Sequence, residues 1–186
     1  MRVTAATKEA TRQRIREAAR ELFQSKGFED TTTRDVAREA GIAAGTLFNY
    51  FASKEALVLD FVAEAFEQTE AAYRKRVRDA MPLEEELFLF VATGLRQLRP
   101  LRGFLRPALE TELNPAAMSD AENGAALRAG HLEVVGSILQ KHRPHDPPTA
   151  VQFQMYWMLY TGLIAFWAND ASAKQEDTLA LLDHSL

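Results

Sequence analysis

The sequence predicts an all-α protein of about nine helices, and three observations support this fold class. Apolar residues recur with a helical period in nearly every segment, and no run alternates apolar and polar residues as a strand does. The chain has 186 residues and is 47% apolar, which is enough to form a buried core. Glycine or proline stands where several periodic segments end, as at Gly27, Gly41 and Pro82.

The first helix is expected to begin at Thr7 or Thr11 and to end at Lys26. Gly27 follows directly, as is typical of a residue that ends a helix. One apolar stripe, spaced at three, four, seven and eight residues, marks the face that packs on the core. Its members are Ile15, Ala18, Ala19, Leu22 and Phe23.

Two short helices joined by a tight turn are expected next. Thr32 is the predicted N-cap and Asp35 stands at the third helical position, which together resemble a capping box. Gly41 breaks this helix, and a third helix begins near Ala43 or Ala44. Helices this short are unstable alone in water, so a larger body must support them.

The later helices are expected to be longer. The third helix turns Leu47, Tyr50 and Phe51 inward, and Ser53 caps a fourth helix that runs from Lys54 towards Pro82. Further helices are predicted over residues 83–99, 104–113, 120–142, 149–169 and 176–186.

Residues 151–167 are apolar on all sides. This stretch is shorter than the roughly 20 residues of a membrane span, and it contains Gln152 and Gln154. We therefore interpret it as a helix buried in a bundle or in a subunit interface. No secretory signal is recognisable at the N-terminus, and the chain has no cysteine, so disulfides and thiolate metal sites are excluded. A cytoplasmic protein without a membrane segment is expected.

The charges are distributed unevenly along the chain. Residues 1–54 hold ten Lys and Arg against seven Asp and Glu, whereas the remainder holds twelve against nineteen. A basic N-terminal part on an acidic body suggests that one end binds a polyanion. The alternative is an ordinary scatter of solvated charges.

A helix, a glycine turn and a second short helix form a helix-turn-helix, whose second helix lies in a DNA major groove. The stretch TRQRIREAARELFQSKGFEDTTTRDVAREAGIAAGTLFNYFASKEAL, from Thr11 to Leu57, resembles the tetracycline-repressor (TetR) family of bacterial regulators. The resemblance implies a DNA-binding domain over residues 1–52 and a helical ligand-binding and dimerisation domain over residues 53–186. It implies as partners a double-stranded DNA operator, a small-molecule effector and a second copy of the chain, with no cofactor.

The resemblance also assigns roles to single residues. It places Thr32, Thr33 and Arg34 at the DNA end of the second helix, and Thr46 and Asn49 where family members read base edges. Asparagine suits this role because it pairs with adenine through two hydrogen bonds. Phosphate contacts fall to Tyr50 and Lys54, although the tyrosine ring also suits the core. The remaining expected DNA contact is Ala44.

Two departures from the family pattern concern the third helix. Ala43 and Ala44 replace residues that are commonly polar, so the helix lacks a capping hydroxyl, at a cost of about 0.5–2 kcal/mol. Phe48 replaces a more common tyrosine. Base reading is therefore expected to use Arg34, Thr46, Asn49 and apolar contacts with thymine methyl groups.

Other classes of function have less support. All four histidines lie in the C-terminal half, without a metalloprotease motif or a glycine-rich phosphate loop, so no enzyme is expected. The pair His142 and His145 supplies too few ligands for a metal site. An architectural DNA-binding protein is a stronger competitor, but such a protein needs no large, aromatic-rich acidic body.

The aromatic residues of the body are mostly core or interface, and some are expected to line an effector pocket. The predicted pocket walls are Phe66, Phe88, Phe104 and Tyr156, with Arg106 as the polar anchor. Other candidate polar groups are Arg102, Glu110 and His131. The chain is thus expected to be a repressor that binds a palindromic operator as a homodimer and is released by an apolar or amphipathic effector. The alternative is a constitutive DNA-binding protein without an effector.

Overall fold

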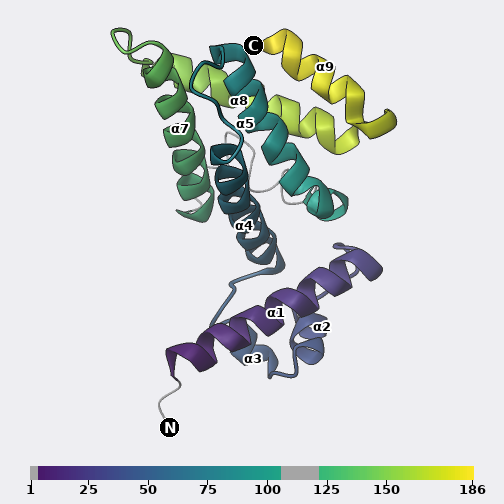
Figure 1. Cartoon of the computed structure of the whole chain (residues 1–186). Coiled ribbons are helices and arrows are strands. Elements are labelled where there is room, and N and C mark those ends of the chain that lie inside the picture. The colour runs from purple at the N-terminus through teal and green to yellow at the C-terminus, as the bar shows by residue number, and fades with distance from the viewer. Residues whose placement is uncertain (1–3, 106–121) are drawn as a thin grey trace.

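The computed structural model describes residues 4–105 and 122–186, and every regular element in these ranges is helical, which confirms the all-α prediction. Three N-terminal helices form one end of the molecule, and α4 connects them to the body (Figure 1). The α-helices are α1 Ala5–Ser25, α2 Thr33–Glu39, α3 Ala44–Leu47, α4 Lys54–Arg74, α5 Leu83–Leu98, α7 Glu122–His142, α8 Ala150–Asn169 and α9 Glu176–Ser185. Short 3-10 turns cover η1 Arg99–Leu101 and η2 Ala173–Gln175.

The N-terminal helices begin and end where local chemistry requires. The α1 helix starts earlier than predicted because the Thr4 hydroxyl caps it, accepting from the Thr7 main-chain N–H at 3.2 Å. Gly27 and Gly41 adopt φ values of +92° and +65°, which residues with a side chain rarely adopt. The predicted capping box of Thr32 and Asp35 is present at the start of α2.

The α4 helix begins at Lys54 as predicted, but it ends at Arg74, so the prediction that it continues towards Pro82 was wrong. The main-chain N–H groups of Arg76 and Val77 turn back to the Tyr73 carbonyl at 2.8 and 3.0 Å. This turn brings Val77 against the core of the body.

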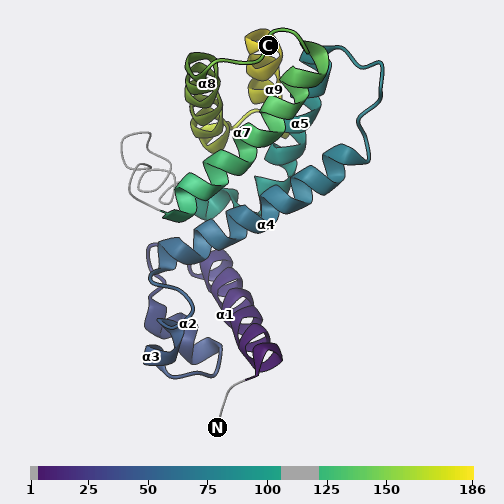
Figure 2. The ribbon, with the colours of Figure 1, turned by 90° about the vertical axis from the view of Figure 1, so that its left-hand side faces the viewer.

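In the body, α5 packs on α4, and α7 runs beside both (Figure 2). The α8 and α9 helices pack together farther from the N-terminal helices. One apolar core holds α1, α2 and α3 against the first half of α4 and continues to Phe104 and Trp167, across the domain boundary predicted after residue 52. A second core, around Phe90 and Ile138, fills the distal part of the body.

The α8 helix is not buried on every side of this chain. Trp157, Ile164 and Trp167 are buried, but the opposite face carries several exposed apolar side chains. Among the residues described, no helix combines the length and the apolarity that crossing a bilayer requires. An exposed apolar face of this kind is typical of a surface that contacts another molecule.

Candidate functional site

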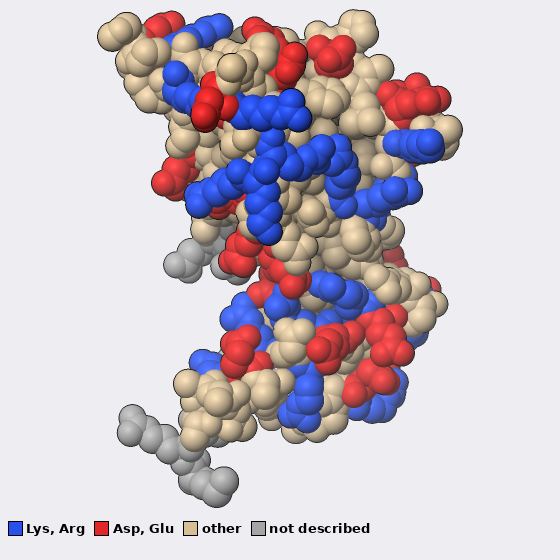
Figure 3. Space-filling view, viewed as in Figure 1, with Lys and Arg blue, Asp and Glu red and all other residues tan. Residues whose placement is uncertain are grey.

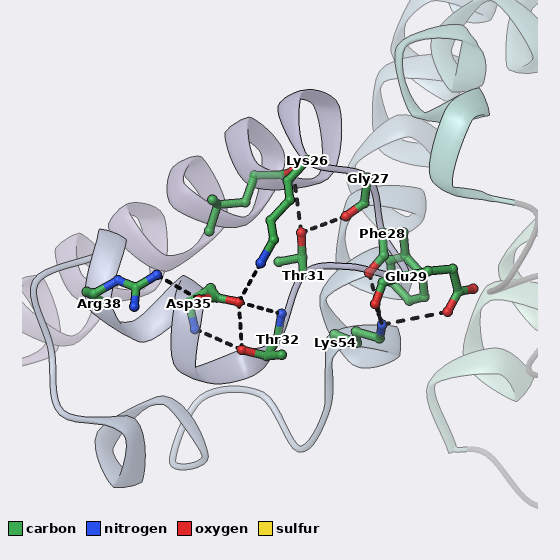
Figure 4. A network of polar contacts seen from close by, with 10 residues as sticks. Lys26, Gly27, Phe28, Glu29, Thr31, Thr32, Asp35, Arg38 and Lys54 are labelled. Carbon is green, nitrogen blue, oxygen red and sulfur yellow. Dashed lines mark hydrogen bonds and ion pairs between the residues drawn. The ribbon is translucent and has the colours of Figure 1, made fainter.

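Polar contacts around Asp35 hold the helix-turn-helix unit in place (Figure 4). Its carboxylate accepts hydrogen bonds from the Thr32 main-chain N–H at 3.1 Å and from Lys26 Nζ at 3.0 Å. Arg38 donates to the other carboxylate oxygen at 2.7 Å. Hydrogen bonds from Thr32 and then Lys26 hold the pKa of Asp35 well below its usual range. The carboxylate therefore stays ionised at the N-terminus of α2, where the helix dipole favours an anion.

A second set of contacts fixes the loop before α2 (Figure 4). Lys54 donates to the main-chain carbonyls of Phe28 at 2.9 Å and Glu29 at 3.3 Å, and its ammonium lies 4.2 Å from the centre of the Phe28 ring. The Thr31 hydroxyl donates to the Gly27 carbonyl at 2.6 Å. The Lys54 ammonium is therefore engaged within the protein, so a phosphate contact by this residue would compete with these carbonyls.

The residues predicted to contact DNA differ in exposure. The exposed ones are Thr32, Arg34, Ala44 and Asn49. Those that are partly buried are Thr33, Thr46, Tyr50 and Lys54. Tyr50 packs its ring against the N-terminal core, as the sequence suggested. No contact with DNA is present to test these roles, which stay predictions.

Phe48 is an exposed aromatic residue that sequence reasoning treated only as a departure from the family. Its side chain is 54% exposed at the end of α3, while Leu47 beside it is fully buried. The helical period would have revealed this, because a face that buries Leu47 and Phe51 turns Phe48 outward. Ala43 makes no side-chain cap for α3, as predicted.

Arginines of α1 are tied to acidic residues of α4. Arg12 pairs with Asp60; Arg16 pairs with Asp60 at 2.8 Å and with Glu64 at 2.6 Å; Arg20 pairs with Glu64 at 2.9 Å. Arg16 and Asp60 are largely shielded from solvent, whereas Arg12 and Arg20 are more exposed. These ion pairs connect α4 to α1, which packs on the helix-turn-helix.

The body contains a chamber of about 70 Å³. Its walls come from α4, α5, α7 and α8, together with Leu105. The lining residues are Val62, Phe66, Thr69, Phe90, Val91, Gly94, Leu98, Leu105, Leu127, His131, Trp157, Tyr160, Thr161 and Ile164.

The chamber matches the predicted pocket only in part. Phe66 lines it, and Tyr156 reaches it indirectly through a hydrogen bond to His131 at 2.8 Å. Phe104 instead packs between Phe23 and Phe61 in the N-terminal core, and Phe88 lies in the distal core, outside the chamber walls. Arg106 and Glu110 lie outside the described residues. Helical periodicity shows which residues are buried, but not which core they join.

His131 is the polar group that the chamber does contain. Aromatic rings surround it, with the Tyr160 ring centre at 4.1 Å and the Phe90 ring centre at 5.1 Å. Burial lowers the pKa of His131 to about 3, so the imidazole is neutral at physiological pH. The chamber therefore has a hydrogen-bonding group but no charge from this residue.

A buried carboxylate, which sequence reasoning missed, joins three helices of the body. Glu86 accepts from the Tyr73 hydroxyl at 2.5 Å and from Lys141 at 2.8 Å, and one of its oxygens lies 2.6 Å from His142 Nε2. Burial alone raises the pKa of Glu86, but the hydrogen bonds from Lys141, Tyr73 and His142 outweigh it and lower the pKa overall. Within the described ranges, no cluster of three or more His, Asp or Glu could hold a metal ion.

On one face of the molecule, charge is less segregated than it is along the sequence (Figure 3). On the face shown in Figure 3, acidic and basic side chains mix over the N-terminal helices, and a group of Lys and Arg also lies on the body. The helix-turn-helix geometry is therefore a stronger indication of DNA binding than the charge distribution.

The N-terminal geometry agrees with comparisons to known proteins. Residues 15–61 match the family model described as bacterial regulatory proteins, tetR family. This N-terminal segment belongs to the TetR family. UidR of Escherichia coli K12, an HTH-type transcriptional regulator, is 28% identical over 134 residues, which cover 72% of this chain and 65% of UidR. The chain thus spans somewhat less than two thirds of the length of that relative.

Two further TetR-family similarities concern different parts of the chain. The transcriptional repressor KstR2 of Mycobacterium tuberculosis is 40% identical over 78 residues, 41% of this chain and 39% of KstR2. The crystal structure of Thermus thermophilus FadR, a TetR-family repressor in complex with lauroyl-CoA, superposes with a TM-score of 0.73 at 24% identity, over 93% of this chain and 90% of FadR. The named relatives are transcription regulators rather than enzymes, in agreement with the sequence prediction.

Proposed function

We propose that this TetR-family chain is a transcriptional repressor that binds a palindromic operator as a homodimer and releases it when an apolar or amphipathic effector enters the body. Residues 1–52 bind DNA, and residues 53–186 bind the effector and the second subunit. The observation that carries the proposal is the α2–turn–α3 unit. Hydrogen bonds from Lys26 and Arg38 to Asp35 stabilise this unit. Arg34, Phe48 and Asn49 stay exposed on it. A rigid unit with exposed polar and apolar groups suits a DNA groove.

DNA binding is tested by selecting fragments from a random duplex library with the full chain and then measuring variants on the recovered sequence. Asn49→Ala is expected to lose about 1–3 kcal/mol of discrimination at one base pair. Tyr50→Phe keeps the ring in the core and removes only the hydroxyl, so it is expected to weaken binding to all sequences equally. Fluorescence anisotropy on the selected fragment and its single-base variants measures both effects.

Lys75→Ala is the control, because this exposed residue directly follows the C-terminal end of α4, whereas α3 precedes the N-terminal end of that helix. Lys54→Ala is a poorer probe, because it also removes hydrogen bonds that hold the α1–α2 loop. Unchanged affinity and unchanged base preference in both Asn49→Ala and Tyr50→Phe would refute the proposed contacts.

The exposed apolar faces of α8 and α9 support a homodimer. Leu159 is 61% exposed and Met155 60% exposed, and Leu179 and Leu181 add apolar surface from α9. Two copies of such a helix pair can bury these faces as a four-helix bundle. A twofold dimer also matches the symmetry of a palindromic operator.

Leu159→Glu is expected to convert the dimer into a monomer, because it places a charge in the centre of the apolar interface. Sedimentation velocity at micromolar concentration measures the change, and DNA affinity is expected to fall with it. Gln140→Glu adds a comparable charge at an exposed position of α7 and is expected to leave the dimer intact. A wild-type protein that sediments as a monomer under these conditions rules out the dimer.

The chamber and the ion pairs between α1 and α4 support control by an effector. Val62 and Phe66 of α4 line the chamber, while Asp60 and Glu64 of the same helix hold α1. A ligand that displaces α4 therefore moves the helix-turn-helix as well. FadR, which has the same fold, binds the amphipathic molecule lauroyl-CoA, which supports an amphipathic effector here.

A constitutive DNA-binding protein is the second candidate, and the size of the chamber favours it. Ligand pockets commonly measure about 300–1,000 Å³, whereas this chamber holds about 70 Å³. The two candidates are separated by adding small molecules to the complex that the chain forms with the selected DNA. Release by any member of a panel of acyl thioesters, aromatic acids and planar cationic drugs supports an effector, and no release by any of them favours constitutive binding.

A further inference from the structure

The chamber wall indicates which ligand chemistry it accepts. Among the described residues, none of its lining side chains is a Lys, Arg, Asp or Glu, and His131 is kept neutral by burial. A charged group placed there would lose its hydration without gaining a partner, which is strongly unfavourable. The part of a ligand that enters the chamber must therefore be uncharged.

Several polar groups of the wall already have partners. The Thr69 hydroxyl donates to the Ala65 carbonyl at 2.7 Å, and the Thr161 hydroxyl donates to the Trp157 carbonyl at 2.9 Å. His131 Nε2 is paired with the Tyr156 hydroxyl. These groups are satisfied without a ligand.

The indole N–H of Trp157 is different. The side chain is only 3% exposed and lines the chamber, and Nε1 is buried without an acceptor among the described residues. An unsatisfied buried donor costs about 1–3 kcal/mol, and buried polar groups in native proteins usually have a partner. A ligand with a hydrogen-bond acceptor, such as a ketone or ester carbonyl, would supply that partner.

Phe66 separates the chamber from two larger hollows on the surface. It lines the chamber, a groove of about 620 Å³ beside the N-terminal domain, and a groove of about 410 Å³ between α4 and α7. Its side chain is only partly buried, and it lies against Gly130, where a Cβ atom would come within 3.3 Å of the ring. Movement of this one ring would join the chamber to a space large enough for a ligand.

The groove of about 620 Å³, here named the interdomain groove, is lined by residues of both ends of the molecule. Tyr50, Phe51 and Arg12 come from the N-terminal domain, while Phe66 and Leu127 also belong to the chamber wall. Arg12 lies over the Phe51 ring and pairs with Asp60 of α4. A molecule in this groove touches the DNA-binding domain directly.

We propose that the effector is an elongated neutral molecule that spans the chamber and the interdomain groove. Its carbonyl end fills the chamber and accepts a hydrogen bond from the Trp157 indole N–H. The Phe66 ring moves aside, and the other end of the molecule lies in the interdomain groove. This inference rests on the proposed function, because it specifies the effector and its route. Contact with the Tyr50–Phe51 segment and with Arg12 makes length a requirement for DNA release. A ligand that fills only the chamber contacts α4 but no residue of α1, α2 or α3, so it acts on the DNA-binding domain only indirectly.

The carbonyl contact is tested without DNA, by displacement of the fluorescent dye N-phenyl-1-naphthylamine from the full chain. The competitors are 2-acetylnaphthalene and 2-ethylnaphthalene, which have nearly the same shape and differ by one carbonyl group. The ketone is expected to bind about fivefold more tightly to the wild-type protein, as one neutral hydrogen bond allows. In Trp157→Phe the preference is expected to disappear, with the ethyl compound unaffected.

Trp167→Phe is the matched control, because this indole already donates to Gln175 at 3.3 Å and lies outside the chamber wall. It is expected to keep the preference for the ketone. A preference that survives in Trp157→Phe, or tighter binding of the anion 2-naphthoate than of the ketone, overturns the proposed ligand class. Both outcomes are independent of whether the chain binds DNA.

The role of Phe66 is tested by the rate at which the dye enters, measured by stopped-flow fluorescence. Phe66→Ala is expected to speed association several-fold and Phe66→Trp to slow it, because the ring is the wall that must move. Phe88→Ala removes an equal side chain from outside the chamber and is expected to change nothing. Equal association rates in the wild-type protein and the three variants would show that Phe66 is not the barrier to entry.

The length requirement is tested with linear methyl ketones, from 2-heptanone to 2-pentadecanone. At equal displacement of the dye, only the longer members are expected to release the DNA fragment recovered by selection. If short ketones release the DNA equally well, the spanning arrangement is wrong even though effector control stands. If dye displacement follows the prediction but the chain binds no DNA, the proposed function fails and the ligand class stands.

Discussion

Replacing Gly45 with alanine is expected to weaken DNA binding by about ten- to a hundredfold without destabilising the fold. Gly45 is exposed in α3, its φ is not in the left-handed region, and a Cβ atom added there meets nothing within 4 Å. Within a helix, alanine is more stable than glycine by about 0.5–1 kcal/mol, so the folded chain has no need of glycine here. If the backbone of α3 approaches a phosphate, however, the added methyl group blocks a charge-assisted hydrogen bond that contributes about 1.5–3 kcal/mol.

Gly41→Ala is the matched control and is expected to have the opposite pattern. Its φ of +65° is unfavourable for alanine by about 1–2 kcal/mol, so the thermal midpoint should fall. Thermal unfolding and anisotropy on the selected DNA measure stability and binding separately. If Gly45→Ala binds DNA as tightly as the wild-type protein, α3 does not bring its backbone close to the duplex.

Removing the Glu86 carboxylate is expected to cause the largest loss of stability in the body. Glu86→Ala leaves Tyr73, Lys141 and His142 without their shared acceptor, and breaking a buried ion pair commonly costs about 3–5 kcal/mol. The lower end of this range is expected, because the Lys141 side chain is 40% exposed and can reach water. Urea unfolding measures the loss, and the exposed neighbour Glu85→Ala is expected to change stability by less than about 0.5 kcal/mol.

The same carboxylate predicts a dependence on pH. The pKa of Glu86 is lower in the folded protein than in the unfolded chain, so its stabilisation is fully present above the usual glutamate pKa of about 4.3. It is lost as the pH falls below that value towards the folded pKa. The difference in unfolding free energy between wild type and Glu86→Gln is therefore expected to be constant near neutrality and to shrink below about pH 4. A difference that grows on acidification contradicts this assignment.

The sequence alone determined the elements whose signals are local. Thr32 and Asp35 form the capping box because their spacing is that of one helical turn, and Gly27 and Gly41 end helices because only glycine readily adopts their φ values. The helical period likewise placed Leu47 and Phe51 in the core. These features depend on residues a few positions apart, so tertiary contacts do not alter them.

Only the tertiary structure decided the features that join distant segments. Phe66, Phe88 and Phe104 are all apolar residues on helices, yet Phe66 alone of the three lines the chamber, because helix packing decides which core each side chain enters. The end of α4 at Arg74 follows from the packing of Val77 against the body. Glu86 lies in a run of three glutamates that look alike in sequence, and it differs from the other two because α4 and α7 bring it three donors that lie 13, 55 and 56 residues away. A periodic pattern gives the direction of a side chain within its own helix, whereas the partner it meets there depends on how the helices cross.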